Sequence, residues 1–129
     1  MEESRKKTND ELDYWVKRAD EAEIIDNLVI YEISPKLIIN SKLSTSLSLT
    51  KFKDKITVII ADYGEEKLTI SARDQTRKIK VNELLENSVR GLEDSTAGGH
   101  IPAAGATIKK EDKETFKNNL IKNYKSLIK

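Results

Sequence analysis

The spacing of apolar residues near the N-terminus is helical. Leu12, Trp15, Val16 and Ala19 lie on one face, which predicts an amphipathic helix from about residue 8, or earlier, to about residue 23. This apolar stripe needs a surface to cover it, and the helix carries an excess of acidic residues. We favour the domain's own sheet as that surface, and a second protein is the alternative, so these four residues are candidates for docking a partner.

The rest of the chain alternates between strand and helix patterns. The expected elements are a strand at 24–33, a short helix between 41 and 53, a strand at 56–61, a turn at 62–65, a strand at 68–73, a helix capped by Asn82, a short strand at 107–108 and a helix from about 111 to 128. This order predicts an α/β domain whose mixed sheet of about five strands is flanked by helices. Residues 24–129 would form this domain, and residues 1–23 an N-terminal connector or docking helix.

One face of the predicted strand at 68–73 is polar. Strict alternation places Thr69, Ser71 and Arg73 together on that face. Two hydroxyl groups and a guanidinium in a row form either an ordinary solvent-facing strand or an anion-binding strip. The pattern alone favours the solvent-facing strand.

Charge is abundant but balanced over the whole chain. The 129 residues are 35% charged, with 23 Lys and Arg against 22 Asp and Glu. This balance excludes a uniformly basic nucleic-acid coat, so any electrostatic function must be local. Acidic residues predominate in the first 35 positions, and basic residues predominate afterwards.

Several kinds of site are excluded by missing residue types. The sequence has no cysteine, and His100 is its only histidine. A thiol nucleophile, a cysteine zinc site and a paired-histidine metal site are therefore absent, and we expect no metal or cofactor. No apolar window is long enough to span a membrane, and we expect a cytoplasmic protein without membrane contact.

A segment of small residues stands out between positions 95 and 106. Gly98 and Gly99 precede His100, and alanines and Gly105 follow. We expect a loop in which glycines let backbone N–H groups converge on an anion, with the histidine as a further donor. The alternative is that the diglycine ends an element, the alanines pack tightly and the histidine is a surface residue.

The segment from Gly98 to Ile108 closely resembles the Gly-Gly-His-x-x-Ala-Ala-Gly-Ala motif of the DHH-associated domain. This domain is the C-terminal lobe of RecJ-like nucleases, including the archaeal type, and of related DHH phosphoesterases. Ser71-Ala72-Arg73 resembles its Ser-x-Arg strand at a plausible distance upstream. The resemblance covers roughly residues 24–128.

The resemblance implies a role for these residues in holding substrate phosphates, and it favours the anion-binding strip over the solvent-facing strand. The residues so implied are Ser71, Arg73, Gly98, Gly99, His100, Ala104 and Gly105. Many members have a third glycine where this chain has Ala97. The metal lobe of the family needs an Asp-His-His element that this chain lacks, so we expect no catalytic residues and no hydrolysis.

The leading hypothesis is a non-catalytic domain that binds single-stranded DNA, or a short oligonucleotide, as an accessory to DNA replication or repair. One alternative is an interaction module of an archaeal GINS-type replication complex, docked through the N-terminal helix. Another is the substrate-binding part of a split or truncated DHH oligonucleotide phosphoesterase, whose partner is a separate DHH catalytic lobe.

Overall fold

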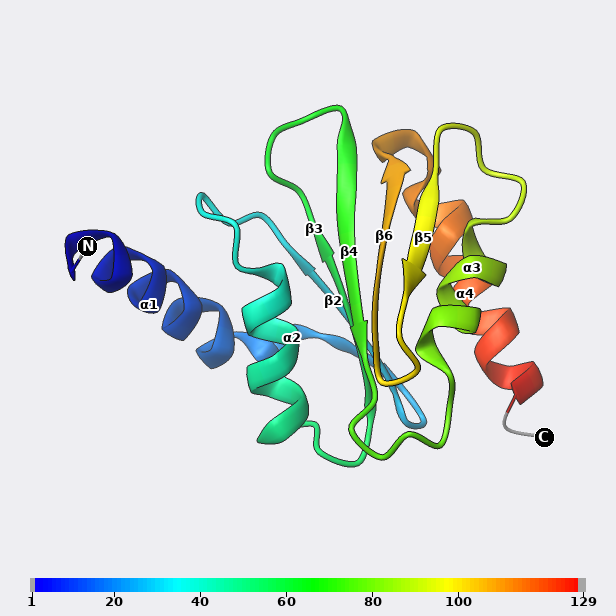
Figure 1. Cartoon of the computed structure of the whole chain (residues 1–129), viewed down its shortest axis with the longest axis horizontal. Helices are drawn as coiled ribbons and strands as arrows, with labels where there is room; N and C mark the ends of the chain where they lie inside the picture. Colours follow the sequence, from blue (N-terminus) through cyan, green and yellow to red (C-terminus); the bar gives the residue numbers. More distant parts are fainter. Residues whose placement is uncertain (1, 128–129) are drawn as a thin grey trace.

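Strands from both halves of the chain pair into one mixed sheet with helices on both faces (Figure 1). The computed structural model describes residues 2–127. Its elements are α1 (Glu2–Lys17), a 3-10 turn (Ala19–Glu21), β1 (Glu23–Ile25), β2 (Leu28–Ile33), α2 (Asn40–Leu49), β3 (Ile56–Ala61), β4 (Lys67–Arg73), α3 (Val81–Val89), β5 (Thr96–Gly99), β6 (Ala103–Lys109), a 3-10 turn (Lys110–Asp112) and α4 (Lys113–Leu127). No helix in this part of the chain is long and apolar enough to cross a membrane.

The six strands have the order β1-β2-β3-β4-β6-β5. Strands β2 and β3 are parallel and are connected through α2, whereas every other neighbouring pair is antiparallel. The expected α/β class with a mixed sheet and an additional N-terminal helix is therefore confirmed, with six strands where about five were predicted.

The face of the sheet toward α3 and α4 carries the larger apolar core. Strand β3 is buried on both faces, as its continuous apolar run predicts. From α4, Phe116, Leu120 and Tyr124 reach this core and are at most 1% exposed. The helical spacing of the sequence also predicts Leu127 and Ile128 on this apolar stripe, but Leu127 is 50% exposed and Ile128 lies outside the described residues.

The opposite face is covered by α1 and α2 over only part of its width (Figure 1). Leu12, Trp15 and Val16 pack against a core that includes buried Ala19. The hydroxyl group of Tyr31 donates to the backbone oxygen of Trp15 at 2.6 Å. The apolar stripe of the first helix therefore contacts the domain's own sheet, which is the alternative we favoured.

Several predicted elements differ in their boundaries. The first helix ends at Lys17 rather than near residue 23, and the short strand expected at 107–108 is the longer β6. The run at 24–33 is a hairpin of two strands, because Asp26 adopts a φ of 54° and lets Ile25 pair with Leu28. The predicted cap is also wrong: α3 begins at Val81, and the Oδ1 atom of Asn82 is buried without a hydrogen-bond partner among the described residues.

Candidate functional site

A shallow groove lies where the α2 side of the sheet is left uncovered. Its floor is the polar face of β4 together with β6, and the N-terminal part of α2 forms one wall. Opposite Ser71, the β6 strand has Gly105, and Ala103 lies opposite Arg73. These small residues leave an open volume of about 430 Å³ beside the β4 side chains.

A hydrogen-bond network fixes the start of α2 at this groove. The side-chain amide of Asn40 donates to Ser71 Oγ, and its Oδ1 accepts a hydrogen bond from Tyr63 at 2.5 Å. The same Tyr63 oxygen accepts from the backbone N–H groups of Ile39 (3.1 Å) and Asn40 (3.0 Å). Burial raises the pKa of the Tyr63 hydroxyl, and the hydrogen bonds from these N–H groups partly offset this rise.

The position of the α2 N-terminus also affects the electrostatics of the groove. The first N–H groups of a helix have no intrahelical acceptor and carry partial positive charge. Ser41 and Ser44, from the first turns of α2, add hydroxyl groups to the wall. Partial positive charge from the start of α2 therefore borders the groove that Arg73 also lines.

Arg73 is the one charged residue among those that line the groove. It forms no ion pair within residues 2–127, and its Nε atom is buried without a hydrogen-bond partner there. An unsatisfied buried donor costs about 1–3 kcal/mol, and one on a charged group costs more. An anion in the groove would satisfy this donor.

The segment of small residues is a β-hairpin, which corrects the expectation of a loop. Strands β5 and β6 are closed by Ile101 and Pro102, because His100 N–H donates to Ala103 O at 2.8 Å and Ala103 N–H donates back at 3.2 Å. Gly99 has a φ of 138°, so one glycine adopts the expected left-handed region. Gly98 is in regular pairing opposite Gly105.

The structure brings five of the seven predicted phosphate-binding residues to the groove lining: Ser71, Arg73, Gly99, Ala104 and Gly105. Ala104 belongs there through its backbone, because its methyl group packs on the α3 and α4 side. Gly98 and His100 are not part of the lining. His100 is exposed at the end of the hairpin.

Sequence reasoning missed part of this site. Thr69 could be placed by alternation along β4, and Thr107 lies opposite it on β6. Asn40, Ser41 and Ser44 line the groove although nothing in the local sequence pattern marks them. Among the described residues, no cluster of three or more His, Asp or Glu side chains could hold a metal ion.

The fold and the site define an α/β domain in which a Gly-Gly-His hairpin lies beside a Ser-x-Arg strand. The model of the DHHA1 domain matches residues 36–126, a segment that includes both elements. The chain therefore belongs to the DHHA1 domain family, whose members are accessory domains of DHH-family proteins. A search of curated protein sequences finds no match.

Solved structures with the same fold come from proteins of different kinds. The chain is similar to PggH, a pGpG-specific phosphodiesterase from Vibrio cholerae, with a TM-score of 0.63 and 13% identity over 97% of this chain and 42% of that one. It also resembles RecJ from Thermus thermophilus in complex with Mn²⁺, with a TM-score of 0.60 and 19% identity over 90% of this chain and 16% of that one.

A third similar structure is the C-Ala domain of alanyl-tRNA synthetase from Aquifex aeolicus. The TM-score is 0.58 at 15% identity, and the match covers 82% of this chain and 96% of that domain. The chain thus spans less than half of PggH and a sixth of RecJ but nearly all of C-Ala. At these identities the likeness shows the fold.

Proposed function

We propose that the chain is a non-catalytic nucleic-acid-binding domain whose groove holds the phosphates of single-stranded DNA. The observation that carries this proposal is Arg73: its guanidinium lies in a groove without acidic lining residues and has a buried donor without a partner in residues 2–127. The small floor residues let a phosphate approach the backbone, and the hydroxyl group of Ser71, whose oxygen accepts from Asn40, supplies a further donor.

For His100 to contact a phosphate as predicted, the ligand must extend from the groove to the end of the hairpin. The hairpin end is fixed by hydrogen bonds from Asp74 N–H to Pro102 O (3.0 Å) and from Val81 N–H to Ile101 O (3.1 Å). His100 is thus held at the open margin of the groove, next to Gly99. A strand lying along β4 and β6 would contact Arg73 in the groove and His100 as it leaves.

Fluorescence anisotropy with a labelled thymidine oligonucleotide at low salt tests this proposal. Arg73→Ala combined with His100→Ala should weaken binding by roughly 10- to 100-fold, because charge-assisted hydrogen bonds contribute about 1.5–3 kcal/mol. The matched control is Lys122→Ala with Lys125→Ala, exposed cations on α4, which should bind like wild type. Unchanged affinity in the Arg73 and His100 variant would overturn the groove assignment.

We also infer that the chain does not hydrolyse its ligand, because the Asp-His-His element of the DHH lobe is missing from the sequence. A manganese-dependent assay on short single-stranded DNA and RNA checks this. Turnover by highly purified protein that is lost on mutation within this chain would contradict it. We further propose that the domain acts as an accessory to the DNA replication or repair machinery.

A second candidate function is the substrate-binding part of a larger or split DHH phosphodiesterase. PggH, whose fold includes a region like this chain, is a longer protein. Exposed apolar side chains beside α1 offer a docking surface: Ile38 is 78% exposed, Tyr14 49% and Leu37 37%. Glu11 holds this surface together by accepting hydrogen bonds from the N–H groups of Lys36 (2.8 Å) and Leu37 (2.6 Å).

Co-elution with a DHH lobe encoded in the same genome distinguishes the two functions. For the second candidate, Ile38→Asp should abolish co-elution and leave oligonucleotide binding unchanged. Co-elution with a GINS-type replication protein would instead favour the scaffold role, which also predicts docking through the first helix. If no partner co-elutes and DNA binding is retained, only the first candidate function, nucleic-acid binding by the isolated domain, remains.

A further inference from the structure

The basic residues at the two ends of the sheet differ in their ion pairing. At the end where β6 finishes, Lys109 lies 3.7–3.9 Å from the carboxylates of Glu93, Asp94 and Glu111, and Lys110 pairs with Asp62 at 3.0 Å. At the other end lie the loop between α2 and β3 and the loop between β4 and α3. Five exposed or half-exposed basic residues of these loops form no ion pair within residues 2–127: Lys53, Lys55, Arg77, Lys78 and Lys80.

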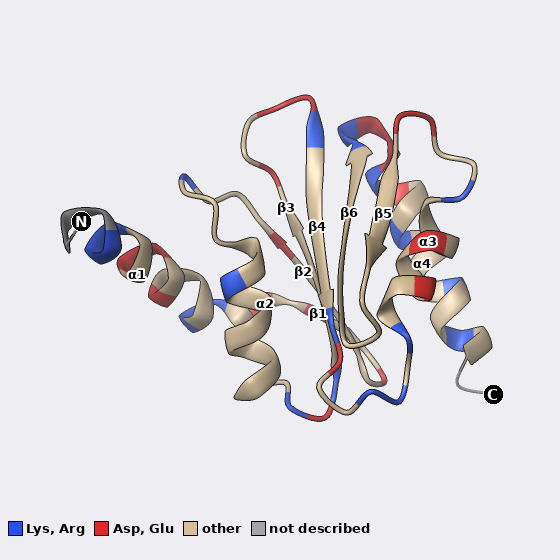
Figure 2. Ribbon diagram, viewed as in Figure 1, with Lys and Arg blue, Asp and Glu red and all other residues tan. Residues whose placement is uncertain are grey.

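We call this surface the basic end. Figure 2 shows its Lys and Arg segments in both loops, below the sheet in that view. Its two acids do not neutralise it. Asp54 is an exposed single carboxylate, and Asp74 is only 2% exposed. The Asp74 oxygens accept hydrogen bonds from Thr76 N–H (2.9 Å), Thr76 Oγ1 (2.6 Å) and Ile79 N–H (3.1 Å), so this carboxylate anchors its loop.

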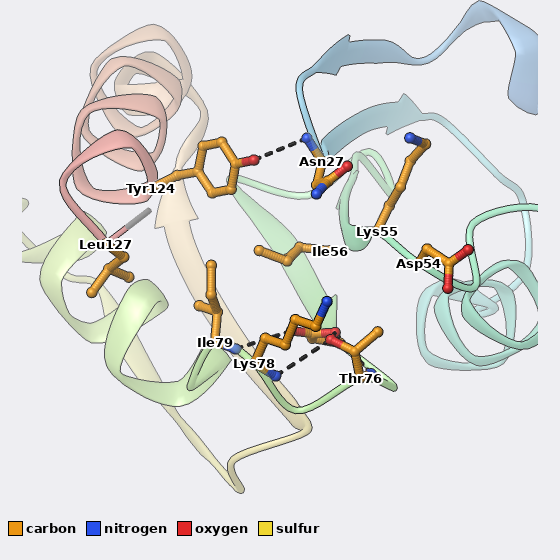
Figure 3. Close-up of a pocket in the computed structure, with 10 residues that line it drawn as sticks. Asn27, Asp54, Lys55, Ile56, Thr76, Lys78, Ile79, Tyr124 and Leu127 are labelled. Atoms are coloured by element: carbon orange, nitrogen blue, oxygen red, sulfur yellow. Dashed lines mark hydrogen bonds between the residues drawn. The ribbon is translucent and has the colours of Figure 1, made fainter. Parts of the chain in front are cut away.

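A pocket of about 240 Å³ opens between these two loops. Figure 3 shows Lys55 and Lys78 coming from different loops at its margin, with Ile56, Ile79 and Tyr124 among its apolar lining residues. The carboxylates of both loops also line this pocket. Pockets for whole small-molecule ligands usually measure about 300–1,000 Å³. This volume therefore suits one planar ring, with attached charged groups left at the margin.

The basic end adjoins the groove along the chain, and its pocket lies against Ile56 and Tyr124 of the core on the α3 and α4 side. Arg73 lines the groove, and the next residue, Asp74, lines the pocket. The loop they begin is hydrogen-bonded to the hairpin end through Asp74 N–H and Val81 N–H. Within this loop Arg77 has a φ of 59°, a conformation that is uncommon for residues other than glycine. A basic residue is thus held at a position where glycine would fit with less strain.

We propose that the basic end binds the part of a single-stranded nucleic acid that extends beyond the groove. Lys55 and Lys78 hold backbone phosphates, and the pocket between them receives one base. Single-strand-binding surfaces combine cations that follow the backbone with side chains that contact bases. Here the lysines supply the cations, and isoleucine side chains rather than an exposed aromatic ring supply the contact for a base. This inference rests on the proposed function, because it describes where the strand continues after Arg73.

Oligonucleotides of two lengths test the proposal. We expect the wild-type chain to bind a thymidine decanucleotide more tightly than a trinucleotide, because only the longer strand reaches the basic end. Lys55→Ala with Lys78→Ala should remove this length-dependent gain and leave trinucleotide affinity unchanged. The salt dependence for the decanucleotide should weaken by about 1.4 in slope, since each single-strand phosphate contact contributes about 0.7.

Matched variants separate the possible failures. Arg73→Ala should weaken both oligonucleotides, and Lys122→Ala with Lys125→Ala removes the same charge from α4 without effect. One outcome is that the Lys55 and Lys78 variant binds the decanucleotide with wild-type affinity and salt slope while Arg73→Ala weakens binding. In that case the proposed role of the basic end is wrong and the proposed role of the groove is retained. If the wild-type chain binds neither oligonucleotide, the proposed function itself fails.

The placement of a base in the pocket can be tested separately by fluorescence. A decanucleotide that carries the fluorescent base 2-aminopurine at successive positions should show an emission change at one position on binding. That change should disappear in the Lys55 and Lys78 variant. Equal emission at every position, or a change that survives the substitutions, would overturn placement of a base between the two lysines.

Discussion

Replacing Gly99 by alanine tests the geometry of the β5–β6 hairpin, on which the groove depends. A Cβ atom at this position would lie 2.6 Å from Ala104 Cα and 2.8 Å from Ala103 O. Ordinary contacts between carbon atoms are about 3.5–4.0 Å, so the hairpin backbone would have to move by roughly 1 Å. The φ of 138° is also unfavourable for alanine.

The two effects act on stability in the same direction. Overpacking costs about 1–3 kcal/mol, and a left-handed backbone conformation costs a residue with a side chain about 1–2 kcal/mol. Their sum, about 2–5 kcal/mol, is a large part of the roughly 5–15 kcal/mol that stabilises an ordinary domain. With a urea dependence of about 1–3 kcal/mol per molar, the middle of each range gives a fall in the unfolding midpoint of roughly 2 M.

The neighbouring glycine supplies the control. A Cβ atom on Gly98 meets nothing within 4 Å, and its φ is not in the left-handed region. Gly98→Ala should therefore be neutral or stabilise by up to about 1 kcal/mol, because alanine restricts the unfolded chain. Urea unfolding followed by circular dichroism measures both variants. A wild-type midpoint for Gly99→Ala, or a larger loss for Gly98→Ala, would refute the hairpin geometry.

Two further predictions concern the α4 side of the sheet. Although burial opposes it, hydrogen bonds from Lys113 and Lys117 lower the pKa of Glu32 below its usual 4.5. As pH falls, the Glu32 carboxylate is therefore protonated first in the unfolded chain, so the stability that Glu32 contributes is present above about pH 4.5 and is lost in more acidic solution. Glu32→Gln should reduce this acid-dependent loss of stability in urea unfolding measured across pH. An unchanged loss would contradict the pairing of Glu32 with the two lysines. Tyr124→Phe removes the acceptor of Asn27 N–H, 2.9 Å away, and should cost about 1 kcal/mol, whereas a wild-type midpoint would show that water replaces the hydroxyl group.

The elements that could be predicted from sequence are those whose side chains show a clear period. Alternation along β4 placed Ile70 in the core and Ser71 and Arg73 on the opposite face, as observed. The hairpin of β5 and β6 shows no such signal, because glycine and alanine have low strand propensity and little hydrophobic contrast. Pairing with β4 determines its conformation, and that pairing is a tertiary interaction.

The same distinction separates the predicted from the unpredicted parts of the site. Ser71, Arg73 and the glycines could be selected because they belong to recognisable motifs, whereas the α2 wall could not. Asn40 reaches Ser71 across 31 residues of sequence. A pattern within one element carries no information about such a contact. The turn at Asp26, by contrast, has a signal in the local sequence, because Asp26 and Asn27 are two polar residues within an apolar run.

The composition of β6 explains why this face of the sheet has a groove at all. Toward α3 and α4, the strand presents Ala106 and Ile108, which are 5% and 0% exposed. Toward the groove it presents Ala103, Gly105 and Thr107, which offer no large apolar surface for another helix to cover. Since the two faces of one strand carry different residues, core packing and groove chemistry are separable. Substitutions confined to the groove face of β6 should therefore change binding and leave the unfolding midpoint of the domain near its wild-type value.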